Sequence, residues 1–472
     1  MADQPDFKLE LSQWKYLSTS DRLMDAVLTV TASGGRVADE AAEVLLVDCS
    51  GSMDWPPTKI DAARKATATA IDALRDGVLF AVVQGTEVAT VVYPTRSELV
   101  PADRETRAQA KAVASRLLPS GGTAMGTWLT QARHLLGRHL NAVRHAVLLT
   151  DGRNESEPAE HLATVLDECE GYFVCDARGI GDDWEPDDLS RIATVLRGTA
   201  DAVVEDAELA ADFERMIESA MSKVVPDLRL RITTLPFTKL RFVKQVHPAE
   251  VDLTDRCTDA GRRTLELSTG SWGEESREYH VCLELDLAGK PMAEDLQLGR
   301  VELVGVTDGV HTPGIPMPIL GYVTEDVVLT SQIHEKVESY IVQGELGQAV
   351  RAGWDAFKGG DREAAGAKWG LAVQLATGLG NETILKRLWR LVDVEDAAAG
   401  RVRIKEDVRP RDGFSAVLGS AISEFGTSSG GGRMVPDNVP DTDRRCTVCT
   451  RVSPPGSVIC VRCGETFSEG AR

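Results

Sequence analysis

The stretch VLLVDCSGSMD, residues 44–54, places a carboxylate and two hydroxyls directly after four apolar residues. A short apolar run that ends in a glycine-containing turn is typical of a strand buried in a parallel sheet. Ligands of such sheets bind just beyond the carboxyl ends of the strands. The sequence therefore predicts that Asp48, Ser50 and Ser52 belong to a site at the end of this strand.

A second stretch, HAVLLTDG at 145–152, repeats the pattern and ends in Asp151. Asp48 and Asp151 should therefore lie at the same edge of the sheet, and the loop PSGGTAMG offers Thr123 just before a helix. Two carboxylates and three hydroxyls are hard oxygen donors, which suit Mg²⁺ or Mn²⁺. Taken singly, the serine loop is an ordinary turn and Thr123 a helix N-cap; the combination predicts a metal site.

The rest of the chain predicts an α/β domain and five further segments. Strand-like runs and helix-periodic segments alternate from residue 43 to about 222, which indicates a parallel sheet covered on both faces. Residues 228–306 alternate apolar and polar residues and predict an antiparallel β-sandwich. Two earlier runs within 8–32 are expected to join the sandwich, so that the α/β domain is either inserted in it or followed by it.

Cysteines mark the end of the chain. Four of the nine cysteines fall into two Cys-x-x-Cys pairs, Cys446 with Cys449 and Cys460 with Cys463. Two such pairs predict a tetrahedral Zn²⁺ site of the closed, structural kind, and the second pair with its following glycine resembles a zinc ribbon. Redox-active pairs are the alternative. A zinc module on a tether favours docking of a protein over a nucleic acid.

The predicted domains are N-terminal strands 1–40, an α/β domain 41–224, a β-sandwich 225–330, a helical domain 331–405, a flexible linker 406–443 and a zinc ribbon 444–472. The helical domain is either a repeat-like binding surface or plain helix packing. The linker is predicted from its glycine, serine and proline content.

Composition and net charge limit the classes of partner that this chain is expected to bind. The 472-residue chain has a formal net charge of -21, which argues against nucleic acid and anionic membrane. An apolar run of the roughly 20 residues that cross a bilayer is missing from the sequence, and so is an N-terminal leader, so we expect a cytoplasmic protein. Cys49 is interpreted as a small filler, and the histidines lack ligand spacing, so no catalytic base or nucleophile is predicted.

The set Asp48-x-Ser50-x-Ser52, Thr123 and Asp151-Gly152 resembles the metal-ion-dependent adhesion site of von Willebrand factor A domains, over about residues 43–222. The resemblance implies that the three hydroxyls bind the ion directly, while the aspartates act mostly through water. It also implies that an acidic side chain of a partner protein fills an open coordination position.

The order of the domains resembles that of intracellular bacterial proteins of this family. That resemblance implies a non-enzymatic adaptor in a signalling or stress-response complex, with a Ser/Thr kinase or phosphatase as partner. One alternative is a substrate-coupling subunit of an AAA+ ATPase of the MoxR or chelatase type. Another is a metal-dependent phosphohydrolase, whose turnover would depend on Asp48.

Overall fold

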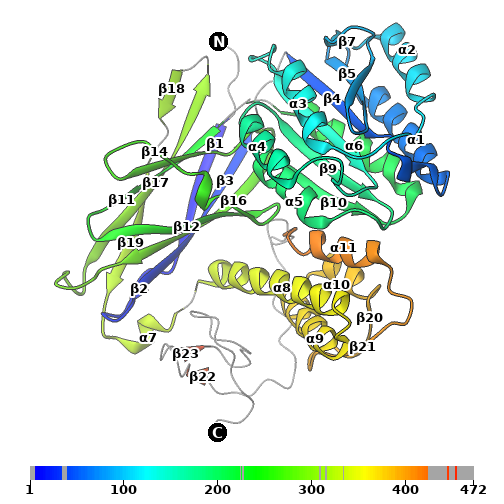
Figure 1. Ribbon diagram of the computed structural model, residues 1–472. Coiled ribbons are helices and arrows are strands. Elements are labelled where there is room, and N and C mark those ends of the chain that lie inside the picture. Colours follow the sequence, from blue (N-terminus) through cyan, green and yellow to red (C-terminus); the bar gives the residue numbers. More distant parts are fainter. Residues whose placement is uncertain are drawn as a thin grey trace.

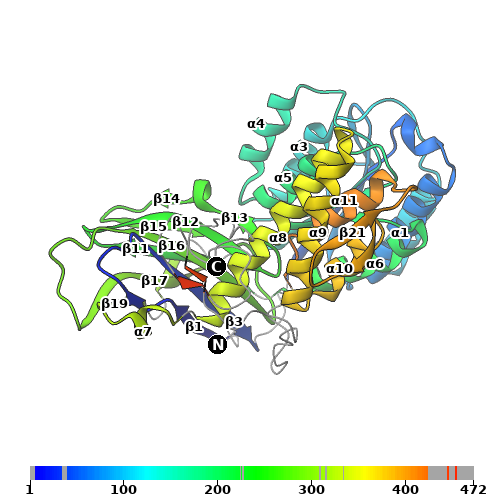
Figure 2. The ribbon, with the colours of Figure 1, turned by 90° about the horizontal axis from the view of Figure 1, so that it is seen from below.

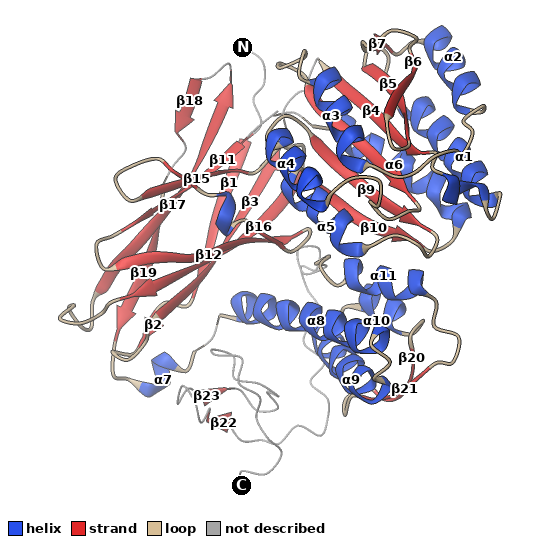
Figure 3. Cartoon of the chain, in the orientation of Figure 1, coloured by secondary structure: helices blue, strands red, loops and turns tan. Residues whose placement is uncertain are grey.

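The computed structural model describes residues 6–34, 40–223, 225, 228–307, 310–313, 316–332, 334–423, 444–445 and 452–453. They form an α/β unit, two mainly antiparallel sheets and a helical unit, which Figure 1 shows at the upper right, the left and the bottom (coloured by secondary structure in Figure 3). The predicted α/β fold is confirmed.

The central sheet of the α/β unit has the strand order β10-β9-β8-β4-β5-β6, and β7 also pairs with β5. The strands from β10 to β5 in this order are parallel, whereas β6 and β7 are antiparallel to β5. The strands are β4 (Ala41–Asp48), β5 (Leu79–Gly85), β6 (Ala89–Tyr93), β7 (Val100–Pro101), β8 (Val143–Thr150), β9 (Val174–Ile180) and β10 (Arg197–Val203).

Helices cover both faces of this sheet, which explains the apolar run in β4. Val44 and Leu46 face the core formed with α3, α4 and α5, whereas Leu45 and Val47 face the core formed with α1, α2 and α6. The helices are α1 (Thr58–Ala73), α2 (Arg104–Ala114), α3 (Met125–Leu136), α4 (Ala159–Cys169), α5 (Pro186–Val195) and α6 (Leu209–Met221), with short 3₁₀ turns at η1 (Gly51–Asp54) and η2 (Asp206–Glu208).

The two antiparallel sheets combine strands from before and after the α/β unit. Thr29 of β3 lies opposite Glu278 of β16, and the sheets share one core that includes Leu28 and Leu230. One sheet has the order β1-β3-β16-β12-β13 and the other β14-β15-β11-β17-β19-β2, with β18 paired to β17; only the β2–β19 pair among these described strands is parallel.

The strands of these sheets are β1 (Asp6–Gln13), β2 (Tyr16–Leu17), β3 (Leu23–Ser33), β11 (Leu228–Thr234), β12 (Thr238–His247), β13 (Val251–Asp252), β14 (Thr258–Asp259), β15 (Thr264–Ser268), β16 (Glu275–Leu285), β17 (Asp295–Thr307), β18 (Val310–Pro313) and β19 (Met317–Val323), with the 3₁₀ turn η3 (Thr254–Arg256).

The helical unit joins the other two parts. The N-terminal half of α8 packs Val337 and Tyr340 on the antiparallel sheets, while its C-terminal half packs Trp354 into the core shared with α5. Figures 1 and 2 show α8 running between these two parts of the molecule. Among the described helices, including the 24-residue α8, none is long and apolar enough to cross a membrane. The remaining elements are α7 (Val327–Thr330), α8 (Glu335–Lys358), α9 (Arg362–Leu379), α10 (Glu382–Leu388), β20 (Val392–Asp396), β21 (Arg401–Ile404), α11 (Pro410–Gly419), β22 (Arg444–Arg445) and β23 (Val452–Ser453).

Three features of the fold differ from the sequence prediction. The edge strand β10 was not predicted, the hairpin β20–β21 lies in the predicted helical domain, and α11 lies in the predicted flexible linker 406–443. The linker boundary was wrong because glycine was taken as a sign of flexibility. Gly413 instead allows close packing: a Cβ there would lie 2.3 Å from the ring of Trp354.

Candidate functional site

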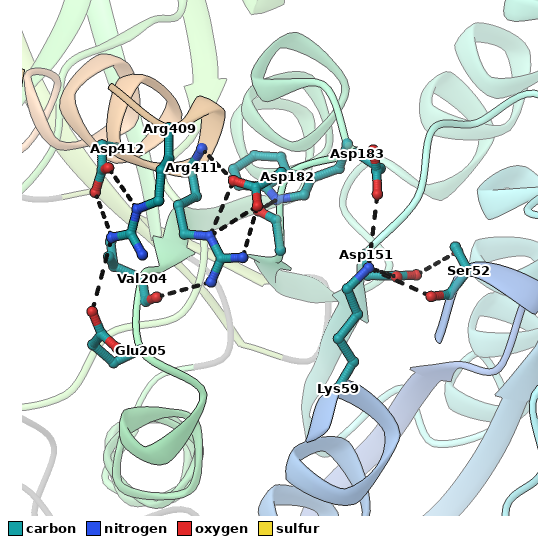
Figure 4. Close-up of polar contacts among 12 residues, drawn as sticks. Ser52, Lys59, Asp151, Asp182, Asp183, Val204, Glu205, Arg409, Arg411 and Asp412 are labelled. Carbon is teal, nitrogen blue, oxygen red and sulfur yellow. Dashed lines mark hydrogen bonds and ion pairs between the residues drawn. The ribbon is translucent and has the colours of Figure 1, made fainter. Parts of the chain in front are cut away.

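The two predicted aspartates lie at the same edge of the central sheet (Figure 4 shows Asp151). Asp48 is the last residue of β4, and Asp151 directly follows β8, the parallel neighbour of β4. Both carboxylates are fully buried. The two aspartates are 103 residues apart in the sequence. The pairing of two adjacent parallel strands brings their carboxylates to the same edge of the sheet.

Backbone hydrogen bonds hold the two hydroxyl-bearing loops together. Gly51 N donates to Gly121 O over 2.9 Å, and Ser120 N donates to Cys49 O over 2.7 Å. Within the first loop, Ser50 N donates to Asp48 Oδ1 over 2.7 Å. The Ser50–Ser52 loop and the loop that leads to Thr123 thus approach the strand ends as one layer.

The three predicted hydroxyls converge beside Gly152. Ser50 Oγ lies 2.9 Å from Ser52 Oγ, and Ser52 Oγ donates to Asp151 Oδ1 over 2.6 Å. A Cβ on Gly152 would lie 3.0 Å from Thr123 Oγ1, 3.3 Å from Ser52 Oγ and 3.8 Å from Ser50 Oγ. Glycine therefore leaves the common centre of these oxygens open.

Both oxygens of the Asp48 carboxylate are held by the chain. Besides the bond from Ser50 N, Thr150 Oγ1 donates to Asp48 Oδ2 over 2.6 Å. Burial raises the pKa of Asp48 to about 6, although these hydrogen bonds act in the opposite direction. Asp48 is thus an ordered, largely ionised group near neutral pH.

A buried lysine completes the site, and the sequence analysis missed it. Lys59 Nζ lies 2.7 Å from Asp151 Oδ2, 3.4 Å from Ser52 O and 3.8 Å from Asp183 Oδ2 (Figure 4). The lysine side chain is only 6% exposed. The sequence signal was its place in α1, since it lies on the helix face that also buries Ala63.

The loop after β9 links this site to the helical unit. Asp183 faces Lys59, whereas Asp182 accepts from Arg411 of α11, with Nη2–Oδ2 at 2.7 Å and Nε–Oδ1 at 3.0 Å (Figure 4). Burial opposes ionisation of Asp182, but the hydrogen bonds from Arg411 outweigh it and lower its pKa. Trp184, which follows Asp183 in this loop, packs on Phe414 of α11 with ring centroids 4.7 Å apart.

Comparisons with known proteins identify the family of this chain. The family model described as von Willebrand factor type A domain matches residues 42–202 of this chain. A solved structure described as von Willebrand factor type A from Catenulispora acidiphila is 41% identical, with a TM-score of 0.84 over 89% of this chain and 98% of that one. This chain belongs to the von Willebrand factor type A family.

A more distant solved structure shows similarity of fold only. The ArnB paralog VWA2 from Sulfolobus acidocaldarius is 12% identical, with a TM-score of 0.51 over 89% of this chain and 99% of that one. The comparison with curated proteins finds no match. The matched residues 42–202 lie within the α/β unit, which we call the von Willebrand factor type A (VWA) domain. Domains of this family generally mediate metal-dependent protein interactions.

The remaining predicted site residues have different outcomes. Cys446, Cys449, Cys460 and Cys463 lie outside the described residues, so the zinc site stays a prediction. Cys49 in the VWA domain is fully buried, and burial raises its pKa to about 12, which agrees with a filler role. The described residues contain no cluster of three or more His, Cys, Asp or Glu side chains fit to hold a metal; the oxygens beside Gly152 are largely hydroxyls.

Proposed function

We propose that this chain is a non-enzymatic adaptor that binds a partner protein through a divalent cation, Mg²⁺ or Mn²⁺. The observation that carries the proposal is the convergence of the Ser50, Ser52 and Thr123 hydroxyls on one point beside Gly152. Hard oxygen donors in this number suit a small divalent ion that keeps some of its water. The ion supplies an electrophilic coordination position for an incoming oxygen ligand.

The hydrogen bonds divide the five residues into two roles. Asp48 uses both oxygens on Ser50 N and Thr150 Oγ1, and so it would reach the ion through water. Asp151 is likewise occupied, with Oδ1 on Ser52 and Oδ2 on Lys59. The three hydroxyls would then be the direct ligands, in agreement with what the family resemblance implies.

Charge favours an acidic ligand. The two positive charges of the ion and the one of Lys59 outweigh the two buried carboxylates, Asp48 and Asp151, by one unit. A third carboxylate near Lys59, that of Asp183, is 73% exposed, and its charge is therefore largely screened by water. In a site whose side chains are largely excluded from water, such an excess attracts a carboxylate more strongly than it would in bulk solvent. An Asp or Glu side chain of the partner satisfies both the coordination position and the charge.

A binding role is also favoured over catalysis. Cys49, the thiol within the serine loop, is fully buried with a raised pKa, which makes it a poor nucleophile. The alternative phosphohydrolase would need a positioned base beside the ion. We therefore infer that the site holds its ligand without turning it over.

The wider setting follows from the family resemblance. We infer a cytoplasmic bacterial signalling or stress-response complex in which a Ser/Thr kinase or phosphatase is the partner. We also interpret the two facing antiparallel sheets as the expected β-sandwich base, and the four C-terminal cysteines as a zinc-binding docking module. Capture of an AAA+ ATPase in place of a kinase or phosphatase would favour the motor-subunit alternative.

Calorimetric titration of Mg²⁺ and Mn²⁺ into the full chain tests the proposal. The double variant Ser50→Ala/Ser52→Ala should stay folded and lose binding of the ion, together with metal-dependent capture of partners. The matched control is Ser115→Ala/Ser339→Ala, because these hydroxyls donate to carbonyls of their own helices. Equal metal binding by both double variants and the unaltered chain would refute the proposal.

A further inference from the structure

Large apolar side chains are exposed on the loops that build the proposed metal site. Trp55 is 79% exposed, Leu118 67% and Val88 58%. Apolar groups of this size in water mark interaction sites when they cluster. We call Trp55, Leu118 and Val88 the apolar rim.

Each rim residue lies on a loop fixed at the carboxyl edge of the sheet. Trp55 follows the 3₁₀ turn η1, which contains Ser52. Leu118 precedes the segment Ser120–Thr123, which is bonded to the serine loop through Ser120 N and Cys49 O at 2.7 Å. Leu118 is therefore two residues from a hydrogen bond that holds the two hydroxyl loops together, and Trp55 is three residues from Ser52.

Val88 belongs to the turn between β5 and β6. In this turn Thr86 O accepts from Ala124 N over 3.1 Å, and the carboxylate of Glu87 accepts from Gly122 N over 2.6 Å. These bonds fall on both sides of Thr123 in the sequence. The third rim residue is thus fixed next to the third hydroxyl.

We propose that the partner of this site is a protein segment in which one Asp or Glu is flanked by bulky apolar residues. This inference rests on the proposed function, because the net positive charge at the ion selects the acidic residue. The rim selects its neighbours, since burying apolar side chains against Trp55 and Leu118 removes both surfaces from water. A small carboxylate ligand would leave the rim in water.

A random-peptide display library tests this inference with the full chain in Mg²⁺ and in chelator. Peptides enriched in Mg²⁺ should share an acidic residue with bulky apolar neighbours. Trp55→Ser or Leu118→Ser should weaken binding of a synthetic peptide from that set at least about tenfold, as expected for a buried apolar anchor. Replacing the acidic residue of the peptide by its amide should abolish binding.

Leu140→Ser is the matched control. Leu140 is 64% exposed, like Leu118, but it precedes β8 and so lies at the opposite edge of the sheet. This variant should bind the peptide as the unaltered chain does. Equal affinities of Leu118→Ser, Trp55→Ser and Leu140→Ser would overturn the inference.

Other outcomes separate the two proposals. Metal-dependent enrichment of acidic peptides with no preference for apolar neighbours would refute the role of the apolar rim in partner selection. The proposed metal-dependent binding function would still stand. Enrichment that is the same in chelator would overturn both. A Mg²⁺-dependent dimer in sedimentation, lost in Trp55→Ser, would assign the rim to a second copy of this chain and overturn the proposed partner.

Discussion

Replacing His145 by leucine should destabilise the α/β unit by about 3–5 kcal/mol, because it removes one member of a buried ion cluster. His145 of β8 lies between two carboxylates, with Nδ1 2.8 Å from Glu43 Oε2 and Nε2 3.1 Å from Asp176 Oδ2. The Glu43 side chain is 0% exposed. Leucine would leave it buried without a counter-charge.

The magnitude follows from the geometry. Two unit charges at the 2.8 Å separation of His145 and Glu43 attract by about 6 kcal/mol when the effective dielectric constant is about 20. Burial opposes the charged forms of both groups, so part of this attraction is offset. For Glu43 burial outweighs the attraction and raises its pKa, and this carboxylate would suffer most from the loss of His145.

The same cluster gives stability a defined pH dependence. Burial lowers the pKa of His145, but the two carboxylates outweigh it and raise the pKa from 6.5 to about 10. The folded state then holds the proton more tightly than the unfolded state. The contribution of His145 is therefore full below pH 6.5 and is lost as the pH rises toward about 10.

Urea unfolding followed by tryptophan fluorescence measures both effects, since Trp128 and Trp184 are buried in the α/β unit. The control is His161→Leu: His161 also pairs with a glutamate, at 2.8 Å, but its side chain is 45% exposed. The paired Glu157 also keeps a hydrogen bond from Gly126 N, at 2.7 Å, so the loss of His161 should cost less than about 1 kcal/mol. Equal losses in the two variants, or the same decline in stability above pH 6.5 in His145→Leu as in the unaltered chain, would refute the reasoning.

Four further changes test other parts of the molecule. Lys59→Met should lower the melting temperature in chelator, by an amount equivalent to about 3 kcal/mol, and Mg²⁺ should restore much of it in a thermal-shift assay, because the ion supplies the missing positive charge. Gly152→Ala should weaken Mg²⁺ binding about tenfold by calorimetry, because its methyl group would intrude 3.0 Å from a ligand hydroxyl. Arg411→Ala should speed hydrogen exchange in α11 by loosening a half-buried ion pair of about 1 kcal/mol, whereas Arg351→Ala, which breaks an exposed pair, should not. Elemental analysis should find roughly one zinc per chain, and Cys460→Ser should lose it.

The sequence predicted the parts of the site that stand at the ends of apolar strands. Asp48 and Asp151 each end such a run, and the rule that ligands bind past the carboxyl ends of parallel strands places them together. The hydroxyl loops were recognised because Gly51 separates Ser50 from Ser52. These inferences need local pattern and a single rule of topology.

Features that depend on distant contacts were not predictable. Lys59 lies on the buried face of α1, but only the packing of α1 in the fold shows that this face turns Lys59 toward Asp151. Strand β10, with the sequence RGTADAV, lacks alternation and is formed by pairing with β9. Helix α11 has two glycines that signal a loop, but Gly413 is required by the ring of Trp354.

The way β3 is paired has a consequence for how this chain is made. Thr29 and Glu278, which face each other across β3 and β16, are 249 residues apart, and the whole α/β unit lies between them. A ribosome therefore delivers every strand of that unit before β3 can acquire its second neighbour, and until then β1 and β3 form a marginal two-stranded hairpin. The α/β unit must therefore fold while the edge of β3 is still unpaired and able to pair wrongly. Slow translation of the residues after α6 would prolong this state and so favour aggregation.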